Sequence, residues 1–446
     1  MSPFFIKAIQ LLLSLSFLIV LHELGHFIPA KLFKTRVEKF YLFFDVKYSL
    51  FKKKIGETVY GIGWLPLGGY VKISGMIDES MDKEQMAGPP QPWEFRSKPA
   101  WQRLIIMVGG VTVNIILGVL IYIFIIFSWG QNYSKGDDIK YGFGVTKTLE
   151  NYGFQQGDKL ITVNGEEMFD DMDIGRYLMV REVNSVTVKH PNGEIQTIKL
   201  PEDIGTEIFK SGQTNAITFR YPFKLDSITE GGPAEKAGLL KTDKILKIGG
   251  MPINYQTDFG YALNNHRKND STAVITYERN GVIKELDLVL DKEKKIGVKM
   301  VSTDKDALKL NNVDYSFGAS ISEGLNFGYW TLHDYIAQFK YVFTKEGATQ
   351  VGGFGAIGNL FPPVWDWAAF WSTTAFISII LAFMNILPIP ALDGGHVMFL
   401  LYEIIAGRKP NDKFMEYAQL VGFIILIALL LFANGNDIYR AISKYF

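Results

Sequence analysis

The sequence predicts a polytopic α-helical membrane protein with four spans, a small α/β domain inserted twice between them, and a membrane-associated β-hairpin. Three observations favour this fold class. Apolar runs long enough to cross a bilayer lie toward both ends of the 446-residue chain, a polar stretch fills the middle, and that stretch contains an internal repeat.

The apolar runs cover residues 4–30, 101–129, 365–406 and 417–432. A helix of about 20 residues crosses the roughly 30 Å hydrocarbon core. The first run is not typical of a signal peptide, because its only basic lead residue is Lys7 and no small-residue cleavage site follows. The third run is too long for one straight helix and is interrupted at Pro388 and Pro390. We therefore predict spans within residues 1–35, 101–130, 365–406 and 415–435.

Basic residues in the short loops predict the orientation of these spans. Lysine and arginine are frequent from Lys31 to Lys54, in the loop 36–100 and just before it, and again from Arg408 to Lys413. Such loops face the cytoplasm. The N-terminus, the large middle region and the C-terminus are then expected outside, and His22 and Asp393 near the inner ends of their spans.

Composition excludes several classes of site and partner. The formal net charge is zero, so we expect no nucleic-acid partner. Cysteine is absent, which removes disulfides, thiolate catalysis and cysteine-based zinc sites. Any metal site must use carboxylates and the six histidines, which are His22, His26, His190, His266, His333 and His396.

The middle region contains a repeat in which residues 153–165 align with residues 238–250, an offset of 85. Each copy reads as a turn, a strand and a glycine turn, so we predict two related domains at 139–202 and 220–302. The Gly-Pro-Ala lead-in at Gly232 and the Ala-Gly-Leu at Ala237 resemble PDZ domains. The first copy lacks that lead-in. Such domains are expected to bind a substrate's C-terminus or to exclude substrates with bulky outer domains, and both readings stay open.

The first span carries the chemistry, because residues 22–26 read H-E-L-G-H. On a helix, positions i and i+4 share a face, so His22 and His26 can bind one metal ion while Glu23 acts as the acid/base. Zinc lowers the pKa of a bound water to about 7. Three such side chains at the end of a membrane helix are costly unless a metal compensates them. The alternative is that they are ordinary juxtamembrane residues.

A third zinc ligand is predicted at Asp393, in the break of the third span. Pro388 and Pro390 break the helix there, and unwound backbone at membrane depth is tolerated only beside a cavity or within protein. His396 is a rival ligand. We favour Asp393, because a carboxylate and a hydroxide neutralise a doubly charged ion. Asp393 could otherwise only cap the helix that restarts after the break.

The HELGH motif, the N-x-x-P-x-P-x-L-D-G-G stretch from Asn385 and the repeat between spans two and three resemble the site-2 protease family. The arrangement is most similar to the bacterial regulator of sigma-E protease. The resemblance implies intramembrane cleavage at zinc held by His22, His26 and Asp393, with Glu23 catalytic. It also implies a bacterial inner-membrane location and a transmembrane protein as substrate.

The same resemblance implies which residues lie near the substrate. Asn385, Pro388 and Pro390 match the broken-helix positions of the family. Residues 110–114 resemble its Gly-Pro-x-x-Asn stretch, but Val111 stands in place of proline. Residues 61–76, with Gly68 and Gly69, read as a glycine-bent hairpin near the inner membrane surface. The family suggests that this element re-enters the membrane and pairs with an extended substrate, whereas the alternative is a plain surface hairpin.

Residues 310–364 predict an amphipathic helix and a linker. Its apolar side chains recur at helical spacing, and we expect it on the outer membrane surface or packed on the repeated domains. This stripe comprises Leu332, Tyr335, Ile336, Phe339 and Phe343.

Three functions remain in view from the sequence. The first is an intramembrane zinc endopeptidase for anti-sigma-factor-like substrates or remnant signal peptides. The second is a membrane-anchored protease with its zinc in the cytosol, which would need a third ligand in a polar helix. The third is a non-catalytic scaffold with PDZ-like domains, which would have no need of Glu23 beside two histidines.

Overall fold

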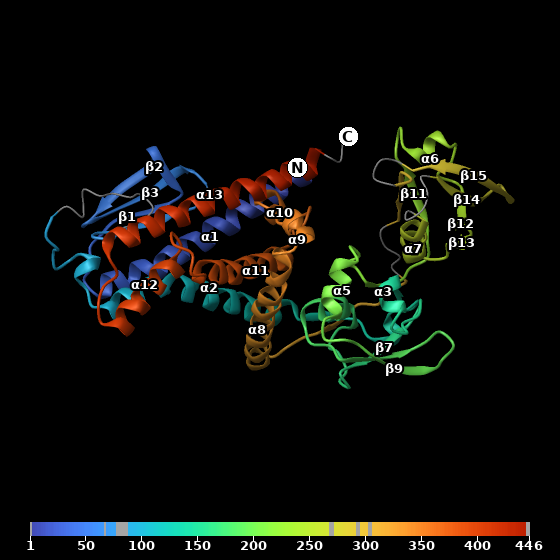
Figure 1. Ribbon diagram of the computed structural model, residues 1–446, viewed down its shortest axis with the longest axis horizontal. Coiled ribbons are helices and arrows are strands. Elements are labelled where there is room, and N and C mark those ends of the chain that lie inside the picture. Colours follow the sequence, from blue (N-terminus) through green and yellow to red (C-terminus); the bar gives the residue numbers. More distant parts are fainter. Residues whose placement is uncertain are drawn as a thin grey trace. The chain divides into compact units, whose positions relative to one another are not determined.

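The computed structural model describes residues 2–66, 68–76, 88–266, 272–290, 295–301 and 306–442 (Figure 1). It divides into two compact units. The helical unit comprises Met1–Gly130 and Asp314–Phe446, and the inserted unit comprises Gln131–Val313.

Four helices of the helical unit are long and apolar enough to cross a membrane, as predicted from the sequence. The predicted break after Asn385 is confirmed, because one helix ends at Ile386 and the next begins at Asp393. The last helix is longer than the predicted span 415–435. The four are α1 (Pro3–Leu32), α2 (Ala100–Trp129), α11 (Trp367–Ile386) and α13 (Asp412–Ile442), and the shorter helix after the break is α12 (Asp393–Ala406).

Helices α1 and α2 cross in close contact through two glycines. A methyl group at Gly25 would lie 2.5 Å from the carbonyl oxygen of Gly109, and one at Gly109 would overlap the carbonyl oxygen of Gly25. Small residues allow the backbones of membrane helices to approach in this way. The crossing brings the histidine-bearing turns of α1 against α2.

A larger side chain at this helix crossing should destabilise the helical unit. We expect Gly109→Val to lower the free energy of unfolding by at least about 2 kcal/mol, because the added methyl groups force the two helices apart. Thermal unfolding in detergent measures the effect. Gly435→Ala on α13 is the control, since a methyl group there meets no atom within 4 Å. A wild-type melting temperature for Gly109→Val would contradict the close crossing.

A four-stranded sheet follows α1, and it corrects the hairpin predicted at residues 61–76. The strands are β1 (Val37–Leu42), β2 (Phe44–Ile55), β3 (Thr58–Leu65) and β4 (Tyr70–Ile73), in the order β2-β3-β1-β4. Strands β3 and β4 do not pair with each other. Both flank β1, which is parallel to β3 and antiparallel to β4, and the hairpin is instead β2–β3.

Aromatic packing explains why β1 takes the central place. The ring of Phe40 contacts Phe27 of α1 and Tyr60 of β3, while Tyr41 stacks on Tyr70 of β4. These contacts hold β1 between its two neighbours and against α1. Strand β4 is left at one edge of the sheet.

The predicted amphipathic helix is α8 (Phe317–Val342), and it packs within the helical unit. Gly324 and Gly328 admit side chains of α2, and the rings of Tyr335 and Phe339 contact Phe383 of α11. The expectation of a helix on the membrane surface or on the repeated domains is therefore wrong for this face of α8. The short helices α9 (Lys345–Gln350) and α10 (Phe354–Gly358) lead from it toward α11.

The inserted unit contains two modules, each with its own buried core. The elements up to Phe219 are β5 (Gln131–Tyr133), β6 (Phe143–Val145), α3 (Lys147–Glu150), β7 (Lys159–Val163), α4 (Ile174–Val180), β8 (Ser185–Lys189), β9 (Ile195–Lys199), α5 (Ile204–Lys210) and β10 (Ile217–Phe219). Those that follow are β11 (Leu225–Ile228), α6 (Pro233–Lys236), β12 (Lys244–Ile248), β13 (Met251–Pro252), α7 (Gln256–His266), β14 (Thr272–Arg279), β15 (Val282–Val289), β16 (Val298–Met300) and β17 (Asn311–Val313).

The sequence repeat folds into the same local structure in both modules. Strands β7 and β12 occupy aligned positions of the repeat. In the turn before each strand an aspartate accepts an equivalent backbone hydrogen bond: Asp158 from Gln155 at 2.8 Å, and Asp243 from Leu240 at 2.7 Å. The PDZ-like character of the modules remains a prediction.

Candidate metal and catalytic site

Three potential metal-ligand atoms converge between α1 and α12. The Nε2 atoms of His22 and His26 lie 3.2 Å apart. Oδ2 of Asp393 lies 3.3 Å from Nε2 of His22 and 3.4 Å from Nε2 of His26. All three side chains are largely buried, so the cluster is shielded from solvent.

The spacing and chemistry of this cluster fit a zinc ion. Ligand atoms bonded to tetrahedral zinc at about 2.0–2.1 Å are separated from one another by about 3.3–3.4 Å. Oδ2 of Asp393 is buried and has no hydrogen-bond donor of acceptable geometry. Leaving such an oxygen unsatisfied costs about 1–3 kcal/mol. A cation at the centre of the three atoms would remove that cost.

Hydrogen bonds on the far side of each imidazole orient it toward the cluster. Nδ1 of His26 lies 2.8 Å from the carbonyl oxygen of Ile106 on α2, to which it donates. Nε2 of His26 therefore keeps its lone pair for a metal. Gly110 makes room for both rings, because a methyl group there would overlap Nε2 of His26 and lie 2.6 Å from Cε1 of His22.

Asn114 of α2 performs the same task for His22. Nδ2 of its side-chain amide lies 3.2 Å from Nδ1 of His22, and its buried Oδ1 has no hydrogen-bond partner. When these two amide atoms exchange places, Oδ1 accepts from Nδ1 of His22, and Nε2 of His22 keeps its lone pair. Ser378 of α11 donates to the backbone oxygen of Asn114 at 2.7 Å, so this residue links α1, α2 and α11. Helix α2 runs unbroken through Val111.

We expect Asn114→Ala to weaken zinc binding by about 10–100-fold, because His22 loses the partner that fixes its tautomer. A competition titration with a chromophoric chelator measures the affinity. Asn114→Asp should retain most of it, since a carboxylate also accepts from Nδ1. Equal affinities for Asn114→Ala and the wild type would show that this contact does not orient His22.

Glu23 lies beside the edge strand of the sheet. A methyl group at Gly69 would be 3.7 Å from Cγ of Glu23, and the backbone amide of Val71 on β4 interacts with the Glu23 carboxylate. One side of Glu23 is therefore bounded by the chain from Gly69 to β4, and the ligand cluster lies on the same turn of α1. Gly68 packs near the ring of Phe44 rather than against Glu23.

The remaining sequence-predicted residues surround the helix break. The side-chain amide of Asn385 lies 3.4 Å from Nε2 of His22, so it borders the ligand cluster. Pro388 is exposed. The backbone of Pro390 packs so closely against Gly422 of α13 that a methyl group at Gly422 would overlap the Pro390 carbonyl.

The cluster lies part-way along α2, an apolar helix that is long enough to cross a membrane. Gly110, which contacts both imidazoles, is about 15 Å from the start of α2 at Ala100 and about 28 Å from its end at Trp129. A bilayer measures about 40–45 Å including its headgroup regions. If α2 spans it, the ligand atoms lie inside the hydrocarbon core, nearer the end of α2 that begins at Ala100.

Among the described residues, His22, His26 and Asp393 form the one group spaced for a metal ion. The rival His396 points away from it and contacts Gln419 of α13 at 3.0 Å. His190 is buried against Asp158 in the inserted unit, and His333 contacts Asp334 on α8. The side chain of His266 is outside the described part of the chain.

Comparison with known proteins identifies the family. The model of peptidase family M50 matches residues 10–429. The chain belongs to peptidase family M50. This confirms the family predicted from the HELGH and Asn385–Gly395 motifs.

Curated relatives of this M50 peptidase match it over nearly their whole length. A protein of Neisseria meningitidis named "Putative zinc metalloprotease" is 26% identical, with 98% of this chain and 99% of the relative covered. Relatives with the same description come from Borreliella burgdorferi, at 27% identity with 96% of both chains covered, and Vibrio cholerae, at 26% with 97% and 98% covered. These names agree with the zinc fit of the ligand cluster.

Proposed function

We propose that this M50 peptidase is an intramembrane zinc endopeptidase that cleaves transmembrane segments of single-span proteins. Its substrates would be anti-sigma-factor-like proteins or remnant signal peptides, in regulated intramembrane proteolysis. The observation that carries the proposal is the ligand cluster of His22, His26 and Asp393, assembled among apolar helices and part-way along α2, which is long enough to cross a membrane. A cytosolic active site would need ligands outside those helices.

His22, His26 and Asp393 would hold the zinc, which when bound polarises the scissile carbonyl and activates a water for attack. Glu23 accepts a proton as that water attacks, and then delivers it to the amide nitrogen when the C–N bond breaks. Asn385, whose side-chain amide lies 3.4 Å from Nε2 of His22, would donate a hydrogen bond to the peptide.

Strand β4 would bind the substrate as an added strand. A transmembrane helix must unwind before its backbone can be cleaved, and an exposed sheet edge stabilises the unwound chain through main-chain hydrogen bonds. Strand β4 lies at the edge of its sheet, with Gly69 and Val71 beside Glu23. Gly68, Pro388 and Pro390 would shape the approach to this edge.

The family supports a multi-pass location in a bacterial inner membrane, and the loop charges support an orientation with the inserted unit outside the cytoplasm. There its PDZ-like modules would contact the ectodomain or the C-terminus of the substrate. They would act as a binding site or as a size filter. Lipid surrounds the helical unit, whose long helices expose many large apolar side chains.

Metal exchange tests the proposal. We expect dialysis against a zinc chelator to abolish cleavage of a reconstituted single-span substrate, because the ligand cluster then lacks its Lewis acid. Added Zn²⁺ should restore it and Mg²⁺ should not, since two imidazoles and one carboxylate suit zinc rather than magnesium. Full activity of the metal-free protein would contradict the proposal.

A further inference from the structure

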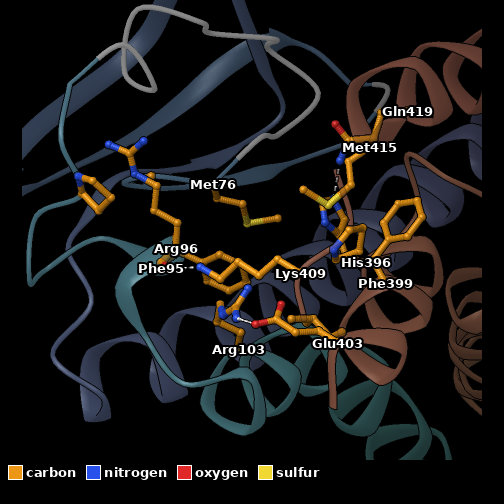
Figure 2. Close-up of a pocket in the computed structure, with 14 residues that line it drawn as sticks. Met76, Phe95, Arg96, Arg103, His396, Phe399, Glu403, Lys409, Met415 and Gln419 are labelled. Carbon is orange, nitrogen blue, oxygen red and sulfur yellow. Dashed lines mark hydrogen bonds and ion pairs between the residues drawn. The ribbon is translucent and has the colours of Figure 1, made fainter. Parts of the chain in front are cut away.

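A cavity of about 230 Å³ lies in the helical unit among α2, α12, α13 and the chain that follows β4 (Figure 2). In Figure 2, Met76 and Met415 reach into it from opposite sides, and Phe399 forms part of the wall. Pockets for drug-sized ligands usually measure about 300–1,000 Å³. This cavity is smaller, which suits a single large side chain.

Helices α2 and α12 each contribute residues both to the ligand cluster and to the wall of the cavity. On α2, Gly110 contacts the imidazoles, and Arg103, about 10 Å nearer the start of the helix, lines the cavity. On α12, Asp393 belongs to the cluster, and the wall from His396 to Glu403 lies about 4–15 Å farther along. Arg103 and Glu403 form an ion pair, so both helices lead in the same direction.

Edge strand β4 also connects the surroundings of Glu23 with the cavity. Val71 of β4 faces Glu23, and Gly75 and Met76, just after that strand, line the cavity. An extended chain lying along β4 advances about 3.3 Å per residue. The centre of the cavity, about 10 Å from the cluster along α2, is then about three residues from the bond beside Glu23.

We propose that this cavity is a substrate pocket that accepts one long apolar side chain, such as leucine, methionine or phenylalanine, about three residues from the scissile bond. This side chain would belong to the substrate segment on one side of the scissile bond, the side on which α2 begins at Ala100 and α12 ends at Ala406. The inference rests on the proposed function, which it extends by a sequence preference.

The lining explains the apolar preference. The polar groups that face the cavity already have partners. Arg103 pairs with Glu403, Arg96 pairs with Glu94, His396 contacts Gln419, and Lys409 donates to the carbonyl oxygen of Arg96. A basic substrate side chain would therefore gain no free carboxylate and would lose its hydration, and an acidic one would meet only the exposed ammonium of Lys409, which water screens. Met76, Phe399 and Met415 supply apolar surface. The flexible methionines can adapt to side chains of different shape.

A pocket-filling variant tests the inference on the full chain in lipid nanodiscs. The substrates form a series with alanine or leucine at each position around the mapped cleavage site. We expect wild type to prefer leucine at the third position. Met415→Trp should lower kcat/KM for the leucine substrate by about tenfold or more and change the alanine substrate less than about threefold. Val421→Trp, at an exposed position on α13, should leave both unchanged.

Equal losses for both substrates, or no preference at any position near three, would overturn the inference. Met76→Trp fills the cavity from the opposite side and replaces Met415→Trp if the latter loses zinc or lowers the melting temperature. A photoreactive residue at position 415 in the Glu23→Gln background gives an answer independent of cleavage. It should crosslink to the substrate peptide, and crosslinks to lipid alone would contradict the pocket. If wild type cleaves no substrate at all, the proposed function fails instead.

Discussion

Replacing Glu23 by glutamine should lower the rate of cleavage of a single-span substrate by about 10²–10⁴-fold and leave the bound zinc unchanged. Glutamine has nearly the same shape as glutamate but cannot accept the proton of the attacking water. Glu23 is not one of the three ligand atoms of the cluster, so metal affinity should not depend on it. Single-turnover cleavage in nanodiscs, with metal analysis of the same sample, measures both quantities.

Two results would argue against this role of Glu23. Undiminished cleavage by Glu23→Gln would exclude it as the acid/base. Loss of zinc together with activity would mean that Glu23 acts as a ligand. Gln10→Leu is a useful control, because Gln10 is also a buried polar residue of α1 but bonds to the carbonyl oxygen of Pro362, away from the cluster.

The second large effect is expected for Asp393→Ala, which should weaken zinc binding by more than about 100-fold and reduce cleavage to background. Loss of an outer hydrogen-bond partner of a ligand typically costs about 10–100-fold, and loss of a ligand should cost more. Asp393 also brings the only negative charge among the three ligands. Its removal leaves two neutral imidazoles to hold a divalent ion.

His396→Ala is the matched control for Asp393→Ala. The two residues lie one turn apart on α12, but His396 contacts Gln419 and lines the cavity. We expect this variant to keep its full zinc content. If Asp393→Ala retained zinc and His396→Ala lost it, His396 and not Asp393 would be the third ligand. Metal analysis after gel filtration, with melting temperatures for both variants, separates ligand loss from misfolding.

The sequence predicted the parts of the site that depend on local geometry. Two histidines at i and i+4 share a helix face wherever the helix lies, and Pro388 and Pro390 break a helix in any context. Loop charges then placed both motifs at the same membrane face. These rules were enough to bring Asp393 to His22 and His26, as the structure places them.

Long-range packing could not be predicted in the same way. Strand β1 lies between β3 and β4 because of ring contacts with Phe27 and Tyr70, and no periodicity in residues 61–76 indicates a third strand. Asn114 was expected to bond between helices, but its contact with His22 depends on how α1 crosses α2. In the sequence, the feature that could have indicated this crossing of α1 and α2 is the presence of small residues, Gly25 and Gly109, in the two helices.

Mapping the cleaved bond tests the central claim most directly. A single-span substrate is incubated with the full chain in nanodiscs, and both products are weighed by mass spectrometry, with Glu23→Gln as the blank. The position of the ligand cluster, about 15 Å from the start of α2, predicts a cut within the apolar segment, toward its cytoplasmic end. Cleavage only in the polar residues outside that segment would contradict an intramembrane site.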